Sequence, residues 1–475
     1  MIKKTIFLLL LIILVKGLTF GQSSSSIRTD GTLLVDGKPF FPFGFYGVGF
    51  RDTYANKIAS IDAVSESRFN TIVFEDISTY NFGGLLDRAA ELGNVKVLVG
   101  LGSTETQSET DIYVTNSVNS HKNKSALLGW SVADDADDGR FSISDLTHRN
   151  NLIKSNDNKH VTFATLTGWD ASRRNKANSF TTITDVSGYQ CYPIGAHRNS
   201  DWTSTTALSQ TYLRTLAYVQ SAALVNRPMI MTLQTFSWGE QSDNPRYPTV
   251  GELRNMLYTS IAAGVKGVIS YDFSFDLKNN QPALWSELKS LTGDVKSIQT
   301  MLLDGKLTRT SSADAELVSS YWESADTCLV VLANTTYNKN KTVSLSLPSK
   351  YAKYVMTPMF NRMSSSLTYF NGVLSGSLKN QEVEVYKFTP GLTTSIDVLA
   401  NKVIYTIHPN PASAELFVGG NFAKNGSYEI ISMEGIHLQT GRLSQVINLR
   451  NLNPALYIIK IRSDEGESIH RFVKE

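Results

Sequence analysis

The chain has 475 residues, with 45 Lys and Arg against 43 Asp and Glu, so its formal net charge is only +2. This near balance provides no electrostatic attraction to nucleic acid or to an anionic membrane, and we expect neither as a partner. Hydrophobic residues make up 41% of the chain and aromatic residues 10%. That content excludes general disorder and is enough for more than one packed core.

The first 21 residues have the pattern of a signal peptide. Lys3 and Lys4 precede an apolar run from Thr5 through Val15, and Gly21 ends a stretch with small or permissive residues at the cleavage-determining positions. The run is shorter than a helix needs to cross a bilayer, so we expect no integral membrane segment after signal cleavage. The pattern predicts a protein that is secreted or attached to the cell surface.

Residues 27–305 alternate short apolar runs with helical patterns, which is typical of parallel strands covered by helices. Gly93 ends one helical pattern, and Thr249 with Glu252 forms a capping box at the start of another, which Gly264 ends. Eight units over about 260 residues predict an α/β fold, a (β/α)8 TIM barrel, with a doubly wound open sheet as the alternative. The runs expected as strands are 41–46, 70–74, 96–101, 127–133, 161–166, 186–192, 228–233 and 265–271.

After the barrel the pattern changes to a period-two alternation interrupted by Asn, Ser and Gly clusters. Residues 310–390 are therefore expected to form a small antiparallel β-sandwich. A linker rich in Thr and Ser leads to a second β-rich module at residues 404–475. The two cysteines, Cys191 and Cys328, fall in different predicted domains, so no disulfide framework is expected.

The C-terminal module carries a combination of motifs. It opens with Pro409-Asn410-Pro411, has a central strand and turn at 428–435, continues with Leu-x-Pro-Ala-Leu-Tyr-Ile-Ile-Lys-Ile at 452–461, and ends in a basic tail. These motifs resemble the C-terminal sorting domain of the type IX secretion system of Bacteroidetes. The resemblance implies passage across the periplasm and outer membrane, with the secretion machinery as partner and removal or surface attachment of the tail. The alternative is a further β-sandwich used for binding.

An apolar run at 127–133 stops at the acids Asp134, Asp135, Asp137 and Asp138. In a parallel barrel the carboxyl end of a strand is where catalytic groups lie. The segment 128–137 resembles the Gly-Trp-Tyr-Leu-Ala-Asp-Glu-Pro-Asp motif after strand four of TIM-barrel glycoside hydrolases. The segments 36–44 and 246–271 resemble, respectively, the hairpin that leads into the barrel of β-glycosidases and the strand-seven to strand-eight region. The resemblance implies a carbohydrate substrate.

Glycoside hydrolysis usually requires two carboxyl groups, one that protonates the leaving oxygen and one that attacks or activates water. Asp135 occupies the position of the acidic Glu in the motif, one methylene shorter, and is expected to be the general acid. Asp134 should alternate to the other side of the strand, where it holds the loop or raises the pKa of Asp135 through like charge. Asp137 and Asp138 are expected to be solvated turn residues.

The second carboxylate is less clear, because Gln234 stands where a nucleophilic Glu would be expected after strand seven. The alternatives are Glu240, Glu75 with its neighbour Asp76, and Asp272. We favour Glu75, which directly follows the apolar run 71–74, although its charge could equally tie down a loop cation.

Aromatic rings stack on the apolar faces of sugars, and amide or carboxyl groups bond their hydroxyls. Trp130 precedes the strand end by several residues and is expected in the core. Ala136 interrupts any calcium-loop pattern in the acid cluster, and the histidines lack metal-ligand spacing, so we expect no metal and no cofactor. The residues expected to bind substrate are Tyr46, Asp134, Tyr192, Gln234, Trp238, Tyr271 and Asp272.

The leading interpretation is a secreted glycoside hydrolase-like protein that acts on a polysaccharide or oligosaccharide. The shortened Asp135 and the amide at Gln234 motivate an alternative, a non-catalytic glycan-binding protein on a degenerate TIM barrel. A third interpretation is an adhesion module in which the β domains carry the function.

Overall fold

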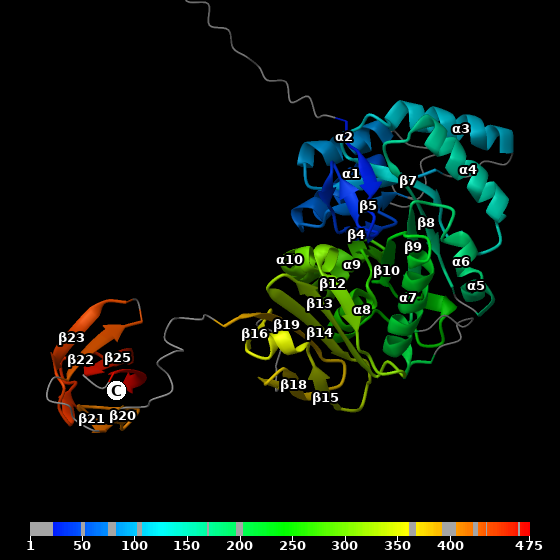
Figure 1. The fold of residues 1–475 in the computed structure, drawn as a ribbon. Helices are drawn as coiled ribbons and strands as arrows, with labels where there is room; N and C mark the ends of the chain where they lie inside the picture. The colour runs from blue at the N-terminus through cyan, green and yellow to red at the C-terminus, as the bar shows by residue number, and fades with distance from the viewer. Residues whose placement is uncertain are drawn as a thin grey trace, which may run out of the picture. The chain divides into compact units, whose positions relative to one another are not determined.

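The computed structural model describes residues 22–48, 53–74, 82–101, 107–168, 171–195, 203–360, 367–391, 405–420, 426–433, 435–463 and 466–475. The expected signal peptide and Glu75 therefore lie outside the described residues. The chain divides into two compact units, Met1–Thr389 and Pro390–Glu475 (Figure 1). Among the described residues, no helix is both long enough and apolar enough to span a membrane.

Eight parallel strands close into a barrel, which confirms the predicted TIM-barrel fold. Every strand lies within two residues of its expected bounds, because strands buried on both faces are continuous apolar runs with turn residues at each end. The strands are β4 (Phe43–Tyr46), β5 (Thr71–Phe74), β6 (Lys96–Gly100), β7 (Leu127–Ala133), β8 (Val161–Leu166), β9 (Val186–Cys191), β10 (Met229–Gln234) and β11 (Gly267–Tyr271).

Helices surround the barrel (Figure 1). The predicted capping box is present: Thr249 accepts from the backbone N–H of Glu252, and Gly264 ends that helix with φ +95°. The helices are α1 (Tyr54–Glu66), α2 (Phe82–Leu92), α3 (Gln107–His121), α4 (Ile143–Asn156), α5 (Ala171–Asn175), α6 (Ala177–Phe180), α7 (Ala207–Ala223), α8 (Val250–Ala263), α9 (Phe275–Asn280) and α10 (Pro282–Asp304).

A small N-terminal sheet covers the end of the barrel where the strands begin. It consists of β1 (Ser25–Ile27), β2 (Leu33–Val35) and β3 (Lys38–Pro39). Leu33 and Val35 pack among the inward-facing barrel residues, and Ser25 Oγ donates to the carbonyl of Leu128 at 2.5 Å. Trp130 is a core residue, as predicted: it is fully buried, and its Nε1 donates to Asp157 Oδ2 at 2.9 Å.

An antiparallel sandwich follows the barrel within the same unit. One sheet has the order β12-β13-β14-β19-β16 and the other β15-β18-β17. Val330 and Leu332 face the second sheet, whereas Val331 belongs to the core cluster shared with the barrel helices. The strands are β12 (Lys306–Arg309), β13 (Leu317–Ser324), β14 (Thr327–Asn334), β15 (Lys341–Ser346), β16 (Tyr354–Pro358), β17 (Thr368–Phe370), β18 (Val373–Leu378) and β19 (Val383–Pro390).

The second unit is a separate pair of antiparallel sheets with its own core. Tyr405, Ile430, Ile459 and Phe472 are all buried in that core. One sheet contains β20 (Tyr405–His408), β21 (Glu415–Gly420) and β24 (Val446–Asn448), and the other β23 (His437–Arg442), β22 (Ser427–Ser432), β25 (Ala455–Ser463) and β26 (Gly466–Lys474).

Candidate functional site

A cavity of about 740 Å³ opens at the carboxyl end of the barrel strands. Since the small N-terminal sheet covers the opposite end, this rim is where the fold exposes side chains to a ligand. The cavity is lined by Asp134, Asp135, Gln190, Tyr192, Phe236, Ser237, Trp238, Glu240, Gln241, Tyr247, Tyr271, Asp272 and Ser274.

Asp134 and Asp135 lie side by side in this cavity. Gln190 Nε2, from β9, donates to Asp134 Oδ1 at 2.9 Å and to Asp135 Oδ1 at 2.8 Å. The expectation that Asp134 alternates to the other side is therefore wrong. The reason is the backbone of Asp135, whose φ of +50° lies in the left-handed region and ends the strand alternation at this point.

Asp134 is held by donors from three strands. Its Oδ1 also accepts from the Tyr46 hydroxyl of β4 at 2.8 Å and from Thr165 Oγ1 of β8 at 2.7 Å. With Gln190 these donors orient the carboxylate on the floor of the cavity. Tyr46 is predicted above to bind substrate, but its hydroxyl donates to Asp134 and it is not among the residues that line the cavity.

Asp135 has the electrostatic setting of a proton donor. Burial, followed by the negative charge of Asp134, raises the pKa of Asp135 to about 7, against the opposing effect of Arg140. A carboxyl group with such a pKa keeps its proton near neutral pH and can transfer it to a leaving group.

The other two acids of the cluster support the loop. Asp137 is buried: its Oδ1 accepts from Thr167 N at 2.8 Å and its Oδ2 from Gly168 N at 3.0 Å. The prediction of a solvated turn residue is therefore wrong for Asp137, because it satisfies backbone N–H groups after β8. Asp138 pairs with Arg140 at 2.5 Å, and Arg140 also donates to the carbonyl of Asp134 at 3.0 Å.

Four aromatic rings form one wall of the cavity. Tyr192 and Tyr271 stack with centroids 5.7 Å apart, and Phe236 meets Tyr192 edge-on at 5.1 Å. Trp238 lies 4.9 Å from Phe236, and its Nε1 donates to the carbonyl of Tyr192 at 3.2 Å. The sequence prediction missed Phe236, which lies beyond the end of β10; strand alternation from Gln234 would not have found it, because the Gln234 side chain does not face the cavity.

Gln234 does not face the cavity. Its Oε1 accepts from Ile194 N at 2.7 Å, while its Nε2 donates to Ile194 O at 2.8 Å and to Phe236 O at 3.1 Å. The side chain is fully buried and holds the chain after β9 against the end of β10.

Two further carboxyl groups line the same cavity. Asp272 follows β11, and burial raises its pKa. Glu240 belongs to the short 3-10 helix η1 (Gly239–Gln241) and is exposed. Among the described residues, Asp272 and Glu240 are the carboxyl groups that line this cavity besides Asp134 and Asp135.

Comparison with known protein families identifies the domain at the C-terminus of the chain. Residues 406–475 match the family model of the secretion system C-terminal sorting domain, so the chain carries that domain. The domain implies export by the type IX secretion system to the cell surface or the extracellular space. No curated protein matches the sequence.

Solved structures with a similar fold include glycoside hydrolases. A glycoside hydrolase of family 5 from Bacteroides vulgatus aligns with a TM-score of 0.53 and 12% identity, over 80% of this chain and 98% of its own. An α-amylase from Anoxybacillus aligns with a TM-score of 0.50 and 10% identity, over 77% of this chain and 99% of its own. At these identities the likeness establishes a shared fold.

Proposed function

We propose that this protein is an exported glycoside hydrolase-like protein that binds a polysaccharide or oligosaccharide in the cavity at the carboxyl end of its barrel. One observation supports this most directly: Asp135, with a pKa of about 7, lines the same cavity as a wall of four aromatic rings. The aromatic wall would stack on the apolar face of a sugar ring, and Asp135 would protonate the glycosidic oxygen.

We propose Glu75 as the second carboxyl group of the reaction because of its place in the sequence. Glu75 follows β5 directly, and the carboxyl end of that strand belongs to the same rim as Asp135. Asp272 and Glu240 are the alternatives in the described cavity. Burial raises the pKa of Asp272, so a smaller fraction of this group carries the negative charge that a nucleophile or base needs.

A non-catalytic glycan-binding protein is the second candidate. The observation that favours it is Gln234, whose amide is fully occupied by backbone groups at the position where the resemblance predicts a nucleophile. Tyr192, Trp238 and Tyr271 would then bind sugar without cleavage.

The decisive experiment is a glycan array combined with a reducing-sugar assay on the full chain. Hydrolysis is expected to fall by about 100-fold or more in Asp135→Asn, with glycan binding retained. The control is Asp326→Asn, an exposed acid in the turn between β13 and β14 that does not line the cavity. Full activity in Asp135→Asn would refute the acid assignment, and binding without any release of reducing ends would establish the second candidate.

The sorting domain assigns the route of export. We propose that residues 1–21 direct the chain to the periplasm and that the C-terminal module then engages the type IX machinery at the outer membrane. A chain truncated before residue 404 should accumulate in the periplasm of a host with that system, whereas the full chain should reach the surface or the medium.

A further inference from the structure

The loop between β10 and α8, residues 235–249, supplies a large part of the candidate active-site cavity. Its second half, residues 243–249, contains no helix or strand, so the position of this half depends on side-chain contacts. Whatever holds the loop therefore sets the shape of the cavity. The cavity-lining residues of the loop are Phe236, Ser237, Trp238, Glu240, Gln241 and Tyr247.

Glu252, in the first turn of α8, gathers the contacts at the end of this loop. Its side chain is buried, and its two oxygens accept from Arg246 Nη1 at 2.7 Å and from Arg246 Nη2 at 2.6 Å. Oε2 also accepts from Thr249 N at 2.8 Å. Burial favours the neutral acid, but the hydrogen bonds from Arg246 and Thr249 hold the pKa of Glu252 below its usual value, so the acceptor is a charged carboxylate.

The fourth hydrogen bond to Glu252 comes from the sandwich. Tyr337, between β14 and β15, donates its hydroxyl to Glu252 Oε1 at 3.1 Å, and this oxygen also accepts from Arg246 Nη2. The carbonyl of Tyr337 in turn accepts from Asn380 Nδ2 at 2.9 Å, in the turn between β18 and β19. A residue of the sandwich thus bonds directly to the carboxylate that holds the cavity loop.

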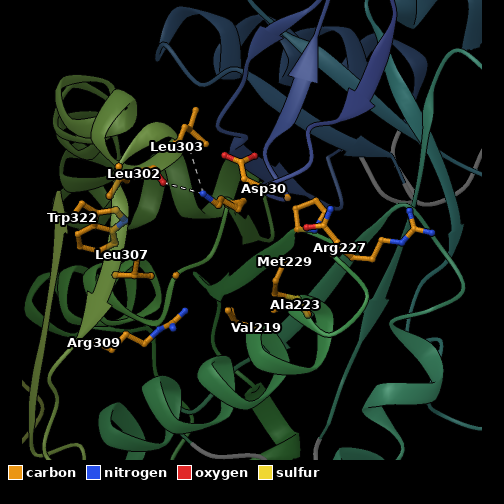
Figure 2. A pocket seen from close by; sticks show the side chains of 16 residues that line it. Asp30, Val219, Ala223, Arg227, Met229, Leu302, Leu303, Leu307, Arg309 and Trp322 are labelled. Atoms are coloured by element: carbon orange, nitrogen blue, oxygen red, sulfur yellow. Dashed lines mark hydrogen bonds between the residues drawn. The ribbon is translucent and has the colours of Figure 1, made fainter. Parts of the chain in front are cut away.

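The sandwich is fixed on α8 in two places. In the first half of the helix, Asn255 Nδ2 donates to Asn334 O at 2.9 Å. At the end of the helix, Arg309 Nε donates to Ala263 O at 3.0 Å. Figure 2 shows this second junction, where residues of β12 and β13 and residues of α7 and β10 surround a cavity of about 290 Å³. The sandwich therefore gives Tyr337 a fixed position relative to the barrel.

Tyr247 is the cavity residue that these contacts hold. Arg246 Nη1 donates to its carbonyl at 3.2 Å, and its half-buried ring lines the cavity. Its hydroxyl donates to Asp276 Oδ2 at 2.5 Å. Because Asp276 is exposed, water competes for that bond, and the contacts on the buried Glu252 carboxylate are the firmer restraint.

We propose that Tyr247 is a further sugar-binding residue of the cavity. Tyr337 of the sandwich is its positioning residue and acts through Glu252 and Arg246. An aromatic ring that is already held in place loses less conformational freedom when a sugar packs on it, so the sandwich raises the affinity for the sugar without touching it. The inference rests on the proposed function, because it requires that the cavity bind a polysaccharide or oligosaccharide.

The test compares KM and kcat in the reducing-sugar assay, on the array oligosaccharide that the full parent chain binds most tightly. Tyr337→Phe removes only the hydroxyl and should raise KM about threefold to tenfold, while kcat stays within about twofold because Asp135 is untouched. If the chain binds glycans without cleaving them, Kd for the same oligosaccharide takes the place of KM.

Tyr351→Phe is the matched control. Tyr351 donates its hydroxyl to Glu323 Oε1 at 3.2 Å within the sandwich, so this variant also loses a bond from a tyrosine to a glutamate. It should leave KM and kcat unchanged, and circular dichroism shows that each variant is folded.

A double-mutant cycle separates positioning from a general loss of stability. In the Tyr247→Ala background, Tyr337→Phe should have no further effect on KM, because the residue through which it acts is gone. Backbone amide exchange of residues 237–247, measured by mass spectrometry without glycan, should be faster in Tyr337→Phe than in the parent chain or in Tyr351→Phe.

An unchanged KM or unchanged amide exchange in folded Tyr337→Phe would overturn the inference, and so would an equal effect of this substitution with and without Tyr247. Failure of the proposed function gives a different result. The parent chain would then neither bind nor cleave any glycan on the array, which removes the sugar-binding assignment of Tyr247, whereas amide exchange still decides whether Tyr337 holds the loop.

Discussion

Glu384 is a fully buried acid near the start of β19, and its replacement by Gln should make stability less sensitive to pH. It pairs in register with Leu332 and shares a face with Tyr386 and Phe388, which belong to the sandwich core. Burial raises the pKa of Glu384 from 4.5 to about 7, with Tyr386 acting in the opposite direction and Glu382 in the same one.

The sign follows from proton linkage. Below pH 4.5 the carboxyl group is protonated in both the folded and the unfolded chain, so it has no pH-dependent effect there. Between pH 4.5 and about 7 the unfolded chain loses this proton while the folded chain keeps it, so the free energy of unfolding falls as pH rises. The pKa difference between the folded and the unfolded chain corresponds to about 3 kcal/mol of the free energy of unfolding, and this contribution is fully lost above pH 7.

Urea unfolding at pH 5 and pH 8 measures this effect. All six tryptophans precede residue 390, so their fluorescence follows the first unit alone. Glu384→Gln should gain stability relative to the parent chain by about 3 kcal/mol more at pH 8 than at low pH. Glu66→Gln, at the exposed end of α1, is the control and should show no such change. A pH-independent difference between Glu384→Gln and the parent chain would refute the argument.

Three further predictions concern the barrel. If Asp135 is the proton donor, kcat/KM should fall about tenfold per pH unit above its pKa of about 7. In Gln190→Ala this fall should begin at a higher pH, because a donor to the Asp135 carboxylate is lost and the pKa of Asp135 rises. A pH profile that is the same in Gln190→Ala and the parent chain would contradict the assignment. Trp130→Phe removes the donor to the buried Asp157 and should lower the free energy of unfolding, measured in urea, by about 1 to 3 kcal/mol. An unchanged free energy of unfolding would show that Asp157 does not depend on this donor. Thr249→Ala removes the side-chain cap of α8 and should lower the free energy of unfolding by about 1 kcal/mol. An unchanged free energy of unfolding would show that Glu252 alone is enough to cap the helix.

The elements that could be predicted are those whose signals are local. Thr249 and Glu252 form their capping box within four residues of chain, and the run 127–133 is apolar throughout because β7 is buried on both faces. Val331 shows the limit of this reasoning. A strand of an isolated sandwich would alternate, but the five-stranded sheet also packs on the barrel helices, so β14 is apolar at successive positions.

The candidate site was predicted less completely because its geometry depends on contacts between distant strands. The sequence placed Asp135 at the carboxyl end of β7, but it could not show that the left-handed backbone of Asp135 brings its side chain to the same side as that of Asp134. Asp137 was assigned to solvent because its partners, the backbone N–H groups of Thr167 and Gly168, lie thirty residues further along the chain. Backbone partners of this kind have no sequence signature.

Gln234 shows why one substitution at this position would not supply a carboxylate to the cavity. Its amide donates to two carbonyl oxygens and accepts from one N–H, and a carboxylate can only accept. In Gln234→Glu the carbonyls of Ile194 and Phe236 would face a negative charge, which should lower stability by about 1 to 3 kcal/mol at pH 8 and by less at pH 5, where protonation returns one donor. Urea unfolding at the two pH values checks this, and the reducing-sugar assay should show no gain in hydrolysis. A variant that is as stable as the parent chain and hydrolyses glycans faster would show that Gln234 can face the cavity after all.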